Sequence, residues 1–267
     1  MKITFLGTGS IIPSSKGGKQ RRSYSAILVE IRNEKLLFDI GPGTLSKMQS
    51  LGINTQIHPD YLFITHYHID HCLDYIALVK GRHFNQKTCC VGNGKILNVF
   101  GPPGLKRWNK DIFQNVLKWN YMSKELDYHE ITNCNEIKKG IVLVTKNWKV
   151  SCCPVEHYNG IAFRLDANGK SFVYSGDMTY DERICKLGKK ADLVAIECSF
   201  PDRKSLNGKH LEPTMIAKLA KIGNFKTVIL THMYPLIDGK EEKIIKTIRQ
   251  SADCKVLSSY DFKTVKL

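Results

Sequence analysis

The stretch Tyr61–His71 constrains what this chain can fold into more than any other part of the sequence. Four apolar or aromatic residues, Tyr61–Ile64, predict a short buried strand. A threonine and then the run His-Tyr-His-Ile-Asp-His follow directly. In an extended segment, side chains two positions apart point the same way. His66 and His68 can therefore bind one metal ion together.

The same stretch predicts ligands for a second metal ion. Asp70 and His71 stand at the start of a helical pattern over residues 70–81, so their side chains turn toward a neighbouring point. The alternative is a polar loop with scattered histidines. With average residue usage, however, this motif arises by chance in a chain of this length with odds of about one in a thousand. Two adjacent metal sites are the better interpretation.

Further side chains that can bind metal or carry protons follow other predicted strands. A histidine in such a place is more often structural when it stands alone, so the order along the chain matters. Asp39 ends a strand, where a turn residue or a helix cap is one interpretation. The others are His157, Asp177, Glu197 and His232, after strands predicted over residues 148–153, 171–174, 192–196 and 227–230.

This order of residues resembles the metallo-β-lactamase superfamily of dinuclear hydrolases. The resemblance implies that His66, His68 and His157 bind one metal, that Asp70, His71 and His232 bind the other, and that Asp177 bridges them. It also implies that Asp39 orients a ligand histidine, so the role of Asp39 is left open between this and a turn or cap. The cofactors expected are two divalent ions. Nitrogen-rich ligation favours Zn²⁺, with Mn²⁺ or Fe²⁺ left open. Zinc can lower the pKa of bound water to about 7, so hydroxide is the expected nucleophile, with Asp70 also counted as catalytic.

Strands fall into two groups with helices between and after them, which by pattern alone indicates a mixed α and β protein. The resemblance implies an α/β (α+β) fold, an αββα sandwich of two mixed β-sheets flanked by helices. At 267 residues the chain is expected to form one domain, 1–267. The pattern also predicts a polar, basic loop over residues 11–23, helices over 70–81 and 105–118, and irregular structure over 120–139.

Within the superfamily, the chain is similar to the ribonuclease Z branch. The turn Gly7–Ser10, Arg22 before a serine, Glu197, His210 before a helix and Thr231-His232 fall in the order of that branch. The resemblance implies that Glu197 orients His210, which protonates the leaving oxygen. Alternatively, Glu197 is a turn residue and His210 a helix-capping or surface histidine.

One departure from the branch bears on the substrate. Enzymes that process transfer-RNA 3′ ends carry a long arm between the third histidine and the bridging aspartate, whereas here only residues 158–176 separate His157 from Asp177. A small or cyclic phosphodiester, or an RNA end, is therefore the expected substrate, with transfer-RNA 3′ processing as an alternative. A thioester or lactone hydrolase is the runner-up, and a nucleic-acid-binding module with an inactive metal site is a third reading.

The formal charge of +15 favours anionic partners, including RNA, although many lysines can simply solvate a surface. In the basic loop, Lys19, Arg21 and Arg22 are the expected substrate-binding residues. The nine cysteines contain no CxxC pair and are expected to be reduced thiols in the cytoplasm. The chain has no tract long enough to cross a membrane, and its first apolar run is too short for a signal peptide. A homodimer is left open.

Overall fold

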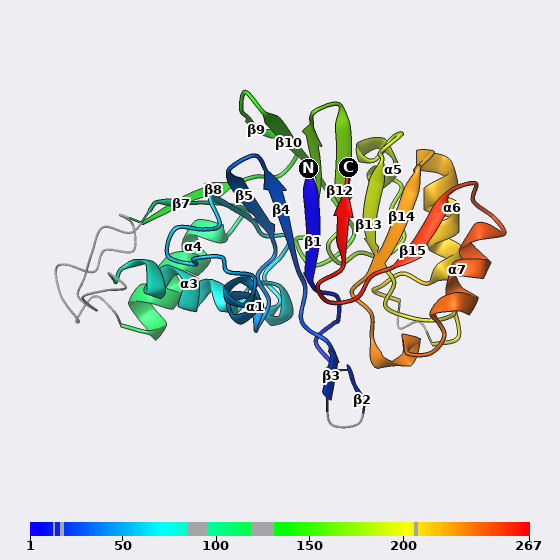
Figure 1. The fold of residues 1–267 in the computed structure, drawn as a ribbon, viewed down its shortest axis with the longest axis horizontal. Helices are drawn as coiled ribbons and strands as arrows, with labels where there is room; N and C mark the ends of the chain where they lie inside the picture. Colours follow the sequence, from blue (N-terminus) through cyan, green and yellow to red (C-terminus); the bar gives the residue numbers. More distant parts are fainter. Residues whose placement is uncertain (13, 17–18, 85–94, 119–130, 206–207) are drawn as a thin grey trace.

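The computed structural model describes the chain except residues 13, 17–18, 85–94, 119–130 and 206–207. Two seven-stranded sheets pack face to face, and helices cover their outer sides (Figure 1). Helices α1, α3 and α4 lie on one side and α5, α6 and α7 on the other. The αββα sandwich expected from the sequence is therefore confirmed.

The first sheet has the strand order β16-β1-β4-β5-β6-β7-β8. Its first strands pair antiparallel, and the run from β5 to β8 is parallel. Parallel strands are covered on both faces and therefore read as continuous apolar runs, as Leu36–Phe38 does. The strands are β1 (Lys2–Gly7), β4 (Ala26–Ile31), β5 (Glu34–Phe38), β6 (Tyr61–Phe63), β7 (Leu97–Gly101), β8 (Thr132–Glu136) and β16 (Thr264–Lys266).

The second sheet has the order β15-β14-β13-β12-β11-β10-β9. Its antiparallel hairpins come first in the chain, and β12 to β15 are parallel. Both hairpins expected from the sequence are present. The strands are β9 (Gly140–Val144), β10 (Trp148–Pro154), β11 (Ile161–Ala167), β12 (Lys170–Tyr174), β13 (Leu193–Glu197), β14 (Thr227–Thr231) and β15 (Lys255–Ser258).

The core between the sheets is aromatic. The ring of Phe38 lies 5.0 Å from that of Phe63 in the same sheet. It also lies 5.8 Å from the rings of both Phe163 and Phe172 in the facing sheet. All four side chains are buried. Phe38 directly precedes Asp39, and Phe63 stands three residues before His66, so the packing of these two rings fixes where those polar side chains emerge.

The helices on the outer faces are short. The described ones are α1 (Thr44–Ser50), α2 (Ile69–Cys72), α3 (Asp74–Arg82), α4 (Leu105–Lys110), α5 (Arg183–Leu187), α6 (Pro213–Gly223) and α7 (Glu241–Arg249). A π-helical turn, Asp111–Val116, continues α4, and a 3-10 turn spans Pro235–Ile237. Among the helices that the structure describes, none is both long and apolar enough to span a bilayer.

The expected helix over residues 70–81 is instead two helices that meet at Leu73. The amide of Asp74 donates to the carbonyl of Ile40 at 3.1 Å, so it is not available to continue the first helix. The Asp74 carboxylate accepts from the amide of Leu45 at 3.0 Å. These contacts tie the start of α3 to the loop after β5, which a helical pattern in the sequence does not reveal.

Two further expectations need correction. Within the segment predicted to be a loop, β2 (Ser14–Lys16) and β3 (Lys19–Arg22) pair as a hairpin, which projects from the sandwich (Figure 1). The region predicted to be irregular contains β8, an edge strand that pairs with β7. Its sequence, Thr-Asn-Cys-Asn-Glu, is polar because an edge strand is partly solvated. Residues 120–130 of that region lie outside the described part.

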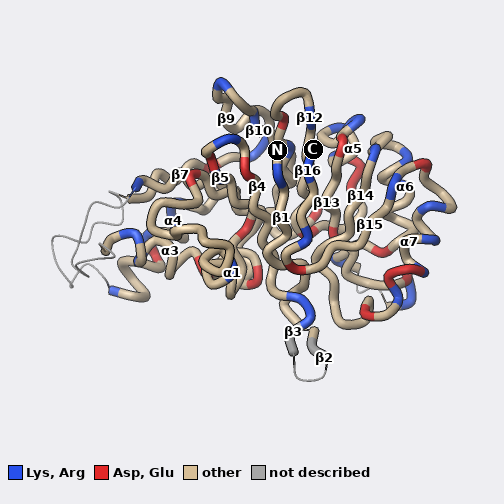
Figure 2. The backbone as a smooth tube through the Cα atoms, in the orientation of Figure 1, with Lys and Arg blue, Asp and Glu red and all other residues tan. Residues whose placement is uncertain are grey.

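The positive charge is spread over the molecule. Figure 2 shows Lys and Arg on strand ends and helices of both halves, with Asp and Glu between them. Some pairs are close, such as Lys2 with Glu30 and Lys226 with Asp192, both at 2.8 Å. In this view the described basic residues are dispersed rather than gathered over one element.

Candidate metal centre

The residues that the sequence singled out come together where strands of both sheets end. Each follows or ends a strand whose buried side chains anchor it in the sandwich. Chain positions more than 150 residues apart become neighbours there. The side chains are Asp39 after β5, His66 to His71 after β6, His157 after β10, Asp177 after β12, Glu197 at the end of β13, and His232 after β14.

The first expected ligand set is assembled. The Nε2 atoms of His66 and His157 lie 2.9 and 3.4 Å from Nδ1 of His68. The same two Nε2 atoms lie 3.8 and 3.9 Å from Oδ2 of Asp177. Ligand atoms on a tetrahedral zinc with bonds of about 2.0–2.1 Å are about 3.4 Å apart. These separations bracket that value, so the four side chains can hold one ion.

The second expected set is assembled beside the first. Oδ2 of Asp70 lies 3.6 Å from Nε2 of His71 and 3.3 Å from Nε2 of His232. Both Nε2 atoms lie 3.2 Å from Oδ1 of Asp177. Asp177 thus presents one carboxylate oxygen to each set, which is the arrangement of a bridging ligand.

Hydrogen bonds fix which nitrogen of each buried histidine is free. The Thr65 hydroxyl donates to Asp39 at 2.9 Å, so Nδ1 of His66, 3.0 Å from the same hydroxyl, must act as donor toward it. The Nδ1–H of His71 donates to Asp39 at 2.7 Å. In both rings the lone pair of Nε2 is left for a metal ion, because the proton sits on the other nitrogen.

Two buried atoms argue that the cluster is built for cations. Among the described residues, Nε2 of His71 and Oδ1 of Asp177 are buried without a hydrogen-bond partner. Buried polar atoms without partners are uncommon because losing water costs about 1–3 kcal/mol each. A divalent ion between these atoms would satisfy both, so the residues present fit a metal.

The charge states of the cluster suit the same role. Burial, with nearby His71, holds the pKa of His66 well below its ordinary value, so the ring is a neutral ligand. Burial opposes ionisation of Asp177, but neighbouring His232 and His71 hold its pKa well below the usual range. For His71, burial lowers the pKa, yet Asp177 and Asp39 raise it well above the ordinary value. Without a metal, a proton on His71 neutralises these carboxylates.

Glu197 and His210 form a separate pair at the edge of the cluster. Nδ1 of His210 lies 3.2 Å from each carboxylate oxygen of Glu197. Glu197 is fully buried and also accepts from the Met178 amide at 2.5 Å and the Ser199 hydroxyl at 2.5 Å. Burial lowers the pKa of His210, but Glu197 raises it to about 9. The imidazole therefore carries a proton at neutral pH.

A cavity of about 390 Å³ opens over the cluster. Asp70 and Asp177 lie at its wall with His210, and Tyr234 closes one side with its ring 5.6 Å from that of His210. Small-molecule pockets commonly measure about 300–1,000 Å³. The opening therefore admits a small substrate to both ligand sets and to His210.

The expected substrate-binding arginines of the hairpin contact acidic residues outside this cluster. Arg21 and Arg22 each contact Glu241 at 3.1 Å, and Arg21 also contacts Asp238 at 3.2 Å. Arg22 is only 4% exposed. The two arginines thus anchor the hairpin to the loop before α7, and substrate binding by the hairpin stays a prediction. The side chain of Lys19 lies outside the described part.

Sequence reasoning missed three residues that support the site. The Tyr174 hydroxyl donates to Asp39 at 2.9 Å. Ser199 links two functional residues, because its hydroxyl donates to Glu197 and lies 3.1 Å from Nδ1 of His232. Tyr234 packs against His210. Ser199 stands two positions after Glu197, a spacing that places both on one side of an extended segment and could have identified it.

Comparison with known proteins agrees with the fold. A protein called Ribonuclease Z from Methanothermobacter thermautotrophicus is 25% identical over 94% of this chain and 92% of its own. The short form of human tRNase Z superposes with a TM-score of 0.76 at 20% identity, over 100% of this chain and 99% of its own. The metallo-β-lactamase fold protein YhfI of Bacillus subtilis gives a TM-score of 0.75 at 19% identity, over 99% of this chain and 98% of its own.

The fold and the ligand cluster are those of a ribonuclease Z-like, metal-dependent hydrolase within the metallo-β-lactamase superfamily. More narrowly, the chain belongs to the family described as Anti-Pycsar protein Apyc1, whose model matches residues 1–220. The expected class is thereby confirmed.

Proposed function

We propose that the chain hydrolyses small phosphodiesters, cyclic ones or an RNA end included, with two zinc ions in the cluster. The observation that carries this proposal is the Glu197–His210 pair beside the two ligand sets. The alkoxide released from a phosphodiester is a poor leaving group and gains most from a proton delivered in the transition state. A thioester or a lactone has less need of that proton.

In this mechanism His66, His68 and His157 would hold one ion, Asp70, His71 and His232 would hold the other, and Asp177 would contribute a carboxylate oxygen to each. When bound, the ions supply an activated water and positive charge for the phosphate oxygens. His210 donates its proton to the leaving oxygen, and Glu197 keeps the imidazole oriented and charged. Ser199 holds both Glu197 and His232, so the proton donor and the ligands keep one geometry.

The short connection between His157 and Asp177 supports a small substrate. It consists of one hairpin, β11 and β12, where transfer-RNA processing enzymes have a long arm. We also propose that the chain works in the cytoplasm, because all described cysteines are free thiols and a reducing compartment keeps them so.

Elemental analysis combined with hydrolysis of bis-p-nitrophenyl phosphate tests the proposal. The purified protein is expected to contain two metal ions per chain and to cleave the diester, and His68→Ala is expected to lose at least one ion and nearly all activity. Full metal content and an unchanged rate in His68→Ala would overturn the ligand assignment. Faster hydrolysis of phenyl thioacetate or a lactone than of any diester would favour the runner-up activity, and cleavage of a transfer-RNA precursor would extend the substrate range.

A further inference from the structure

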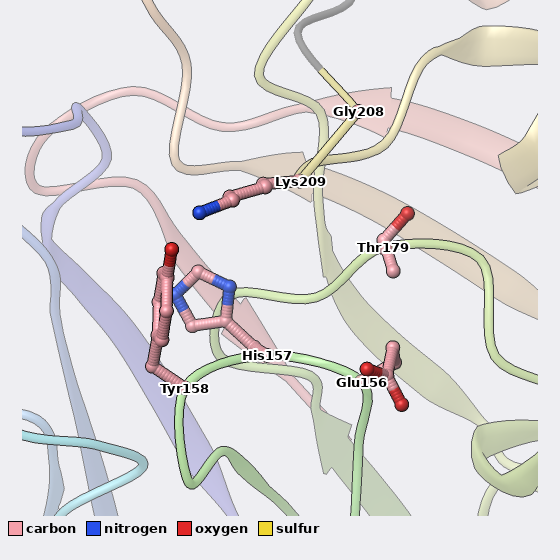
Figure 3. Close-up of a pocket in the computed structure, with 6 residues that line it drawn as sticks. All are labelled: Glu156, His157, Tyr158, Thr179, Gly208 and Lys209. Carbon is pink, nitrogen blue, oxygen red and sulfur yellow. The ribbon is translucent and has the colours of Figure 1, made fainter.

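A second cavity, of about 280 Å³, lies beside the metal centre. One of its walls is His157, a member of the first ligand set, and another is Lys209, which directly precedes His210. The cavity therefore borders one proposed metal ligand, and the residue next to the proposed proton donor lines it. Figure 3 shows the lining residues Glu156, His157, Tyr158, Thr179, Gly208 and Lys209.

Tyr158 is an exposed aromatic residue in an unusual place. Its side chain is 56% exposed, yet its ring lies 5.6 Å from that of His68 and 5.4 Å from that of His157. A tyrosine on the surface keeps a large apolar face in water, which costs free energy unless something covers it. Here the face is next to the ligand cluster, where a substrate would be held.

Lys209 is held against this ring. Its Nζ lies 4.3 Å from the centroid of Tyr158, well inside the distance of about 6 Å for a cation–π contact. Figure 3 shows the Lys209 side chain extending from its backbone toward the Tyr158 ring. The cavity thus combines one aromatic face with one positive charge, a pairing suited to an aromatic group that carries a phosphate.

We propose that Tyr158 and Lys209 form the subsite for the organic part of the phosphodiester, in which Tyr158 stacks on a nucleobase and Lys209 attracts the phosphate toward the metals. A volume of about 280 Å³ is just below the range of ~300–1,000 Å³ typical of drug-sized ligands, so it has room for one ring system. Thr179 gives the wall a hydroxyl that can bond to the edge of a base, whereas the Glu156 carboxylate lies 3.5 Å from Arg183. This assignment rests on the proposed phosphodiesterase function.

The test compares two diesters with the same leaving group, thymidine 5′-(4-nitrophenyl phosphate) and methyl 4-nitrophenyl phosphate. Stacking of one base on an aromatic side chain is worth ~1–3 kcal/mol, so Tyr158→Leu is expected to lower kcat/KM for the thymidine diester about 5–150-fold. The loss on the methyl diester is expected to be at least about fivefold smaller. Tyr158→Phe, which keeps the ring, is expected to restore most of the difference between the substrates.

A matched control lies elsewhere on the surface. Tyr260 is 58% exposed and has Nζ of Lys263 at 4.9 Å from its ring centroid, but it lines neither cavity. Tyr260→Leu is expected to leave both rates unchanged. Lys209→Met is expected to raise KM severalfold for both diesters and to weaken its dependence on salt, because the charge acts on the phosphate.

A binding measurement separates this inference from the catalytic proposal. Thymidine 5′-monophosphate is expected to bind Tyr158→Leu about 5–150-fold more weakly than wild type, whereas inorganic phosphate binds both equally. Equal losses on both diesters and on both ligands, or no loss at all, would overturn the subsite, and so would a loss of metal from Tyr158→Leu that accounts for its rates. If wild type cleaves neither diester, the proposed function fails, and the binding comparison alone decides the subsite.

Discussion

Two buried carboxylate–histidine pairs stand on opposite halves of the sandwich. Asp39 follows β5 of the first sheet and accepts from Nδ1 of His71, and Glu197 ends β13 of the second and accepts from Nδ1 of His210. Both carboxylates are fully buried and both accept several further hydrogen bonds. As hydrogen-bonding units the two pairs are nearly equivalent.

Their second ring nitrogens differ in what surrounds them. Nε2 of His71 is buried at 3.2 Å from one carboxylate, Asp177, and 3.6 Å from another, Asp70. His210 keeps 7% of its surface exposed and lines the open cavity beside Tyr234. The same unit can therefore make a metal ligand or a proton donor, and the groups around the free nitrogen decide which.

The largest expected effect comes from His71. His71→Gln is expected to lose at least one metal ion and nearly all diester hydrolysis, because two carboxylates are then left without a cation or a ring between them. Metal analysis and an assay with bis-p-nitrophenyl phosphate measure this. Circular dichroism of the metal-free variant controls for folding. A variant with full metal and full rate would remove the distinction between the two pairs.

A smaller and selective effect is expected from His210. His210→Ala is expected to keep both metals and the fold while slowing alkyl diesters about 10²–10⁴-fold, the usual range for general acid catalysis. p-Nitrophenyl diesters are expected to lose much less, because p-nitrophenolate leaves without a proton. Atoms of His210, Asp177 and His232 lie within 4.8 Å of one another. Loss of a metal ion from the variant would therefore show that His210 is a ligand. Equal losses of rate on both substrates would show that it positions the substrate.

Substitution of the carboxylates sharpens the comparison further. Asp39→Asn is expected to weaken metal binding about 10–100-fold, the usual effect of removing a partner of a ligand histidine. Glu197→Gln is expected to leave metal affinity unchanged and to lower kcat on alkyl diesters. Titration with a competing chelator measures the first effect and steady-state kinetics the second. The same affinity loss in both variants would show that both pairs serve the metals.

The smallest effect concerns pH and the metal-free protein. Glu197 raises the pKa of His210 to about 9, against about 6.5 for a free histidine. The pair therefore stabilises the folded state fully below pH 6.5, and this contribution is lost as pH rises toward 9. The difference in free energy of unfolding between wild type and His210→Gln should shrink over that interval, as urea denaturation can measure. A difference that grows with pH would contradict the charged pair.

Much of the site could be predicted from the sequence because its parts are local. The spacing of His66, His68, Asp70 and His71 within six residues fixes their relative directions once a strand precedes them. The assignment of His157, Asp177 and His232 as ligands depended on their order along the chain. Asp39 stayed open between two roles. Nothing in the sequence shows that the end of β5 places the Asp39 carboxylate beside Nδ1 of His71.

The errors in the fold also have physical causes. The break between α2 and α3 follows from a hydrogen bond between Asp74 and Ile40, which are 34 positions apart. The hairpin of β2 and β3 depends on the contacts of Arg21 and Arg22 with Glu241, more than 200 positions away. A basic, glycine-containing stretch indicates a loop until those partners are known.

By itself, therefore, the sequence determined the types of the candidate ligands and their order, since these follow from residue chemistry and short-range geometry. The class of reaction followed from the resemblance that this order carries. Tertiary structure decided which oxygen of Asp177 faces which ligand set, that Ser199 joins Glu197 to His232, and that Tyr158 meets Lys209 beside the metals. Those facts depend on how two sheets pack across a core of aromatic rings, which no local pattern encodes.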